Sequence, residues 1–150
     1  MSESILSCVF IGHGESYGVN SDELYNSIQN AIKHGVTLFF NGGMGHFDYM
    51  CAQTVSELKK DYPNIRSELV IPYLTFQPRT MKYFDSSIYP DGFEKYHFKS
   101  AIPKRNRWMV DHSQLAICYV THGWGGAART MKYAIKKELQ IINLGNYTPD

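Results

Sequence analysis

Residues 37–45 read TLFFNGGMG, an apolar run that leads directly into a loop with three glycines. A run without polar alternation is typical of a strand that is covered on both faces, as in a parallel sheet. The same order of apolar run and glycine loop occurs at residues 4–14 and again at residues 114–126. A repeated unit of strand, glycine loop and helix is therefore the basis of the predicted fold.

Helix signals stand between these strands. Asn20 is a suitable N-cap, Leu24 and Ile28 would share one apolar face, and Gly35 is placed to end the helix. Pro103 is a favoured first helical residue. Further helices are predicted at 47–60, 104–112 and 130–137, and further strands at 67–71 and 140–144. The stretch 73–101 is the least regular, with a short strand near residue 88, and it is predicted to form a flap or an interface.

This alternation predicts an α/β fold. We expect one domain over residues 1–150, with a single Rossmann-like, doubly wound, mainly parallel sheet flanked by helices. In such a sheet the ligand lies at the carboxyl ends of the strands, near the point where the strand order reverses. All three glycine loops would lie at that edge.

The composition narrows the classes of function. A chain with 43% hydrophobic and 19% charged residues is typical of a globular protein. The formal net charge of +1 gives no overall field towards nucleic acid, which is therefore not expected as a partner. The beginning of the chain lacks a signal-peptide pattern and no apolar stretch could cross a bilayer, so we expect a cytoplasmic protein without a membrane partner. The three cysteines have no C-x-x-C spacing and are expected to be reduced and buried.

The glycine loops are suited to an anion. Glycine lets a ligand approach backbone N–H groups, and the N-terminus of a helix favours phosphate. The dinucleotide pattern G-x-G-x-x-G fails at Tyr17, and the chain contains no G-x-x-x-x-G-K-[ST] phosphate loop. The loops therefore predict a nucleotide or a nucleotide-derived ligand that is bound without either of these motifs.

Four segments together resemble the SLOG superfamily: VFIGHG at 9–14, FNGGMGHFDYMCAQTV at 40–55, RNRWMVDHSQLAICY at 105–119 and GGAARTMKYA at 125–134. This Rossmann-like group includes the lonely-guy proteins and DNA-processing protein A, and the likeness is closest to its small YpsA-like branch of bacteria and phages. The resemblance implies a nucleotide-derived ligand and a homodimer or higher homo-oligomer. Residue 14 is glycine, where the YpsA-like branch has arginine. The third loop also lacks the paired glutamates with which lonely-guy proteins cleave an N-glycosidic bond.

The candidate residues lie in and beside the loops. Asp48 could accept from a ribose hydroxyl or could simply favour the helix dipole, and Asp111 could orient Arg105 or cap a helix. Arg105 and Arg107 could bind phosphate or belong to a solvated basic turn. Thr130 could be an N-cap that also presents its hydroxyl to an anion. The predicted ligand-binding residues are Gly12, His13, Gly14, Gly42, Gly43, Gly45, Asp48, Arg105, Asn106, Arg107, Gly125, Gly126, Arg129 and Thr130.

Three kinds of function remain open, and the near-neutral charge speaks against the third of them, a nucleic-acid-handling protein like the DNA-processing relatives. The first is a binding module that senses or sequesters a nucleotide-derived molecule, with Tyr17 or Trp124 available to stack on a base. The alternative is an N-glycosidic hydrolase or a nucleoside or deoxyribosyl transferase, with Glu15 and Asp48 as the candidate catalytic carboxylates. His13, His46 and His122 lie one in each loop and could converge. They lack a metal-binding spacing, so no metal and no cofactor is predicted.

Overall fold

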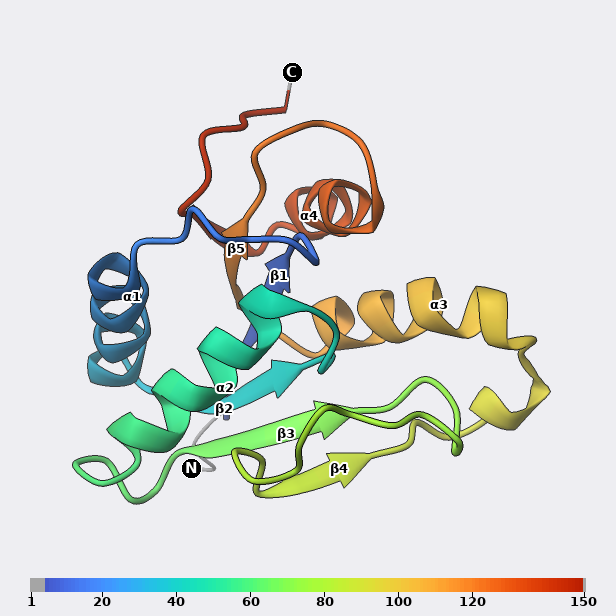
Figure 1. Ribbon diagram of the computed structural model, residues 1–150, viewed down its shortest axis with the longest axis horizontal. Coiled ribbons are helices and arrows are strands. Elements are labelled where there is room, and N and C mark those ends of the chain that lie inside the picture. Colours follow the sequence, from blue (N-terminus) through green and yellow to red (C-terminus); the bar gives the residue numbers. More distant parts are fainter. Residues whose placement is uncertain (1–4, 150) are drawn as a thin grey trace.

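A computed structural model describes residues 5–149, and over this range the strands form one six-stranded sheet (Figure 1). The strand order is β4-β3-β2-β1-β5-β6, and all neighbouring strands are parallel. The doubly wound parallel α/β fold is therefore confirmed, with the order reversing between β1 and β5. The strands are β1 (Leu6–Gly12), β2 (Val36–Asn41), β3 (Arg66–Val70), β4 (Ser86–Ile88), β5 (Leu115–Tyr119) and β6 (Gln140–Asn143).

Helices cover both faces of the sheet, α1 and α2 on one side and α3 and α4 on the other (Figure 1). Successive residues of β1 point to opposite faces, so Cys8 and Phe10 pack under α1 and α2, whereas Val9 and Ile11 pack under α3 and α4. This two-sided burial explains why the strand is apolar throughout. The helices are α1 (Ser21–Lys33), α2 (His46–Leu58), α3 (Phe98–Asp111) and α4 (Gly126–Lys136), with a short 3₁₀ helix η1 (Phe93–Lys95).

The sequence predicted the start of α1 and placed the start of α2 within one residue, but its predictions for the starts of α3 and α4 were wrong. The Asn20 side chain caps α1 by accepting from two backbone N–H groups. Helix α3, however, begins at Phe98, so the prediction that Pro103 opens it was wrong. A proline early in a helix removes only the bond to the carbonyl four residues before it, and here that carbonyl belongs to exposed Lys99.

Helix α4 begins four residues earlier than predicted, at Gly126, with Gly125 as its N-cap. Thr130 is therefore not an N-cap, and its hydroxyl instead donates to the Gly126 carbonyl at 2.8 Å. The irregular stretch 73–101 contains the predicted short strand, β4, which extends the sheet beside β3. Whether that stretch acts as a flap or an interface stays a prediction.

Gly12 at the end of β1 is required by packing. A Cβ atom there would lie 2.3 Å from Cδ2 of the fully buried Phe47, in the first turn of α2. We expect Gly12→Ala to lower the free energy of unfolding by about 1–3 kcal/mol through this overlap. Urea denaturation measures the effect. Gly14→Ala is the matched control, since a Cβ at Gly14 meets no atom within 4 Å, and equal losses in both variants would contradict the packing explanation.

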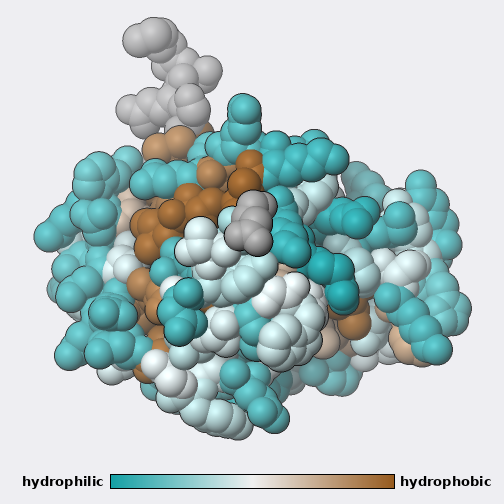
Figure 2. Space-filling model, turned by 90° about the horizontal axis from the view of Figure 1, so that it is seen from above, coloured by the Kyte–Doolittle hydropathy of each residue, from teal (hydrophilic) through white to brown (hydrophobic). Residues whose placement is uncertain are grey.

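Figure 2 shows hydrophilic residues around most of the outline and residues of intermediate hydropathy near the centre, with a band of hydrophobic residues above and to the left of the centre. Apolar surface of this kind is typical of contacts between chains. The homo-oligomer implied by the sequence resemblance stays a prediction. No helix within residues 5–149 has the length and apolar character needed to cross a membrane.

Candidate functional site

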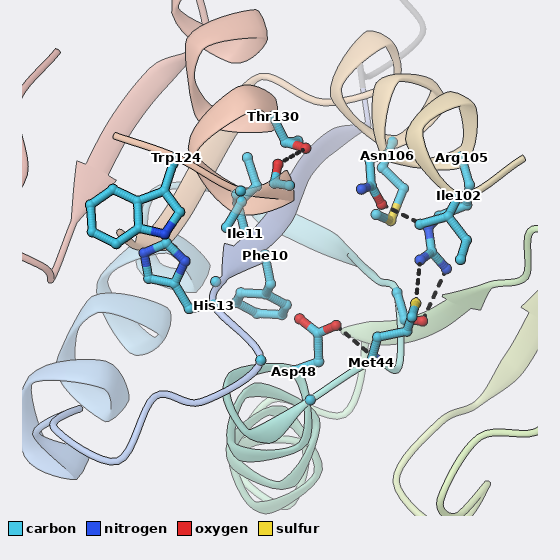
Figure 3. Close-up of a pocket in the computed structure, with 18 of the residues that line it drawn as sticks. Phe10, Ile11, His13, Met44, Asp48, Ile102, Arg105, Asn106, Trp124 and Thr130 are labelled. Atoms are coloured by element: carbon cyan, nitrogen blue, oxygen red, sulfur yellow. Dashed lines mark hydrogen bonds between the residues drawn. The ribbon is translucent and has the colours of Figure 1, made fainter. Parts of the chain in front are cut away.

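A cavity of about 490 Å³ opens at the carboxyl edge of the sheet, where the strand order reverses between β1 and β5. The loops after β1, β2 and β5 meet around it, and α3 closes one side (Figure 3). The structure brings most of the predicted binding residues together here. Those that line the cavity are Gly12, His13, Gly14, Gly42, Gly45, Asp48, Arg105, Asn106, Gly125, Gly126 and Thr130.

Four predicted residues lie elsewhere. Gly43 has a φ of 64°, and a Cβ there would lie 2.6 Å from Leu69, so this glycine serves the turn and its packing. Glu15 is exposed and does not line the cavity. Arg107 and Arg129 line a separate groove between α3 and α4.

Helices α2 and α4 start in the same way at the cavity. Their N-caps, Gly45 and Gly125, have φ of 93° and 92° with ψ of 177° and 175°, a conformation that favours glycine. Neither helix has a capping side chain. The two N-termini thus present backbone N–H groups and positive partial charge to the same region. The first loop differs, because α1 starts away from the cavity and is capped by Asn20.

Asp48 is the carboxylate of the cavity, and it is only 8% exposed. Its Oδ2 accepts from the Met44 N–H at 2.9 Å, and the carboxylate points into the cavity (Figure 3). Burial raises the pKa of Asp48 to about 7, although the Met44 N–H and the charge of Arg105 oppose this rise. The group therefore changes between hydrogen-bond donor and acceptor near neutral pH.

Arg105 is 2% exposed, so its interpretation as part of a solvated basic turn was wrong. One guanidinium nitrogen donates to the carbonyls of Gly42 at 3.0 Å and Val70 at 2.7 Å. Nε donates to the Asn106 side chain, and the other terminal nitrogen contacts the Met44 sulfur. Most of the guanidinium donors are thus used within the protein, where they join α3 to the ends of β2 and β3.

Asp111 does not orient Arg105. Its carboxylate accepts from the Tyr133 hydroxyl at 2.7 Å and lies 3.9 Å from Lys137 Nζ. These contacts join the end of α3 to α4, away from the cavity. The predicted partnership between Asp111 and Arg105 was therefore wrong.

The rings of His13, His122 and Trp124 form a stack along one wall of the cavity. His13 and Trp124 lie on the side of the cavity opposite Arg105 (Figure 3). The rings of His13 and His122 have centroids 3.9 Å apart, and those of His122 and Trp124 lie 3.6 Å apart. Nε2 of His13 accepts the Thr121 N–H, and burial followed by the charge of His122 lowers the pKa of His13. The stack therefore favours a neutral His13, and Trp124, 70% exposed, extends it towards solvent.

His46 does not join the other two histidines, because it packs against Tyr17 and contacts the Ser16 carbonyl. Within residues 5–149 no three potential metal ligands come together.

The apolar part of the cavity was not predicted from the sequence. Its residues are Phe10, Ile11, Met44, Ile102, Met109 and Ala127. Phe10 and Ile11 directly precede the first glycine loop, a position that could have identified them.

The sequence model of the YspA SLOG family (YpsA) matches residues 7–144. No curated protein matches the chain. Among solved structures, DNA processing protein A from Streptococcus pneumoniae is similar over 93% of this chain and 50% of its own, with a TM-score of 0.67 and 16% identity. The Helicobacter pylori protein of the same name is similar over 92% and 64%, with a TM-score of 0.66 and 17% identity. The chain therefore spans only part of both proteins, and at this identity the likeness concerns the fold.

The structure of the Helicobacter pylori protein concerns the way in which that protein binds single-stranded DNA. Our expectation that nucleic acid is an improbable partner was therefore wrong, because a protein with this fold binds a DNA strand. The physical reason is that net charge averages over the whole surface, whereas a strand responds to the charge of the patch that it contacts.

Proposed function

The chain belongs to the YspA SLOG family, and from this premise we propose that it binds a nucleotide or a nucleotide-derived molecule in the cavity, as a single domain that senses or sequesters this ligand. The observation that carries the proposal is the start of α4. Gly125, Gly126 and Ala127 line the cavity at a helix N-terminus that has no capping side chain. Such a terminus suits a phosphate group.

The other walls suit the rest of a nucleotide. Asp48 lies in the cavity, where its Oδ2 accepts from the Met44 N–H and its other carboxylate oxygen is left for a ligand. The side chain can form a hydrogen bond with a sugar hydroxyl in either protonation state. Trp124 has an exposed ring at the rim, backed by His122, and this ring can stack on a base. Phosphate, sugar and base would then contact α4, α2 and the third loop respectively.

Gly126→Asp tests the phosphate position. A Cβ at Gly126 meets no atom within 4 Å, and an acidic residue in the first turn favours the helix dipole, so the fold should keep its stability. The added carboxylate would repel a phosphate at the same N–H groups. We expect a loss of affinity of at least about tenfold in calorimetric titrations with AMP, ADP-ribose, NAD and cyclic nucleotides.

Gly126→Asn is the matched control, since it adds a side chain of nearly the same size without the charge. It should retain more affinity than Gly126→Asp. If none of these nucleotides binds to the folded wild-type protein, the proposed function is wrong.

The second candidate function is cleavage or transfer at the N-glycosidic bond of a nucleotide. One observation favours it, which is that Asp48 lies in the cavity with a pKa raised to about 7, near the value that suits a general acid or base at neutral pH. Glu15 is exposed outside the cavity, and this leaves Asp48 as the candidate. Chromatography of nucleoside monophosphates after incubation should then show release of the base, and Asp48→Asn should abolish it. If no base is released from any of the four common nucleoside monophosphates, this alternative function is wrong.

A further inference from the structure

A second hollow, of about 310 Å³, adjoins the cavity between α3 and α4. The two share part of their lining, including Asn106, Gly126 and Thr130. Gly126 and Thr130 belong to the first turns of α4, where we place the phosphate of the ligand. A molecule whose phosphate contacts Gly126 therefore has a direct path into this second hollow, which we call the α3–α4 groove.

The charge of the α3–α4 groove has one sign. In the described part of the chain, the charged side chains that line it are Lys99, Arg107 and Arg129. All three residues are exposed, and none of them takes part in the ion pairs found within residues 5–149. With a net charge of +1 for the whole chain, this is a strong local excess of positive charge.

Neighbouring groups leave this charge available. The guanidinium of Arg107 lies over the Tyr133 ring, 5.6 Å from its centroid, which orients the side chain without neutralising it. The carboxylate at the far end of α3, Asp111, accepts from the Tyr133 hydroxyl and lies near Lys137. The groove thus combines an ordered guanidinium with two further cations beside the phosphate position.

We infer that the α3–α4 groove holds a second phosphate group of the ligand, so that the ligand class is a nucleotide with two phosphates attached to different sugar positions. The inference rests on the proposed function, because the first phosphate sits at the start of α4. Guanidinium groups bind phosphate through paired, charge-assisted hydrogen bonds, and both Arg107 and Arg129 can supply them. Phosphates attached to different sugar positions occur both in free nucleoside bisphosphates and along a nucleic acid strand.

The test compares the nucleoside 5′-monophosphate with the 3′,5′-bisphosphate for each of the four common bases, by calorimetry. For at least one base, the wild-type protein should bind the bisphosphate at least about tenfold more tightly, which corresponds to about 1.4 kcal/mol. In the double variant Arg107→Gln/Arg129→Gln this ratio should fall to about one. Lys132→Gln is the control, since it removes a positive charge from an exposed position of α4 outside the groove, and it should keep the ratio.

Each outcome is decisive. Binding of monophosphates and bisphosphates with equal affinity, or a preference that survives in the double variant, overturns the inference but leaves the proposed function intact. Absence of binding by all the probes contradicts the proposed function and this inference together. A final arm uses a 5′-phosphorylated single-stranded oligonucleotide of mixed sequence. If it displaces the bisphosphate from wild-type protein but binds the double variant weakly, the second phosphate belongs to a strand. If it fails to displace the bisphosphate, the second phosphate belongs to a free nucleotide.

Discussion

Arg105→Ala is expected to lower the free energy of unfolding by about 3–5 kcal/mol, the largest effect that we predict for a single substitution. The guanidinium is buried and donates to the Gly42 and Val70 carbonyls, at the ends of two different strands. Alanine would leave both carbonyls without this donor and would open a space the size of the lost side chain. It would also remove the positive charge that offsets buried Asp48. The loss should therefore be larger at pH 8, where Asp48 is ionised, than at pH 5.

Urea denaturation followed by circular dichroism measures this loss. Arg107→Ala provides the matched control two residues further along α3, because Arg107 is exposed and contacts the Tyr133 ring. It should cost less than about 1 kcal/mol. Arg105→Lys keeps the charge but not the two-pronged geometry, so it should fall between the other two. Similar losses for Arg105→Ala and Arg107→Ala would refute the role that we assign to Arg105.

Asp48→Asn is expected to stabilise the protein, and the gain should grow with pH. An ordinary aspartate ionises near pH 4, whereas burial raises the pKa of Asp48 in the folded protein to about 7. Between these two values the unfolded chain releases a proton that the folded protein retains, so the stability of the wild type falls as the pH rises. The variant has no such group. Its advantage should be near zero at pH 4 and should reach at most roughly 4 kcal/mol above pH 8.

The asparagine can keep the bond to the Met44 N–H, since its side-chain oxygen accepts in the same way. The measurement is a series of urea denaturations from pH 4 to pH 8.5 on both proteins. Glu15→Gln is the control for loss of a carboxylate from an exposed position at the same edge of the sheet. A gain that is independent of pH, or one that Glu15→Gln reproduces, would show that burial of Asp48 is not the cause.

Much of the fold was predictable because it depends on local patterns. Uninterrupted apolar runs require a strand that is covered on both faces, and alternating runs and helices require parallel connections. The edge at which the glycine loops meet follows from this topology, and so does the position of Asp48 beside the second loop. Asn20 shows the same locality, since a cap acts on N–H groups only two and three residues away.

The role of each glycine was not predictable, because for several of them the available space is limited by a side chain that is distant in the sequence. A larger residue than Gly12 would overlap with Phe47, whereas a side chain at Gly126 would meet no neighbouring atom and would extend into the cavity. In sequence the two residues look equivalent. The structure also assigns Arg107 and Arg129 to a groove of their own, a separation that depends on how α3 packs against α4.

By itself, the sequence determined the doubly wound parallel sheet and the edge at which the glycine loops meet, since both follow from periodicity and connection rules within short segments. Only the tertiary structure decided that the Arg105 side chain is buried and forms hydrogen bonds that link the ends of two strands. Its partners, Gly42 and Val70, stand 63 and 35 residues away along the chain. An arginine in a polar stretch carries no local sign of such contacts, because its burial arises only when α3 closes over the ends of β2 and β3.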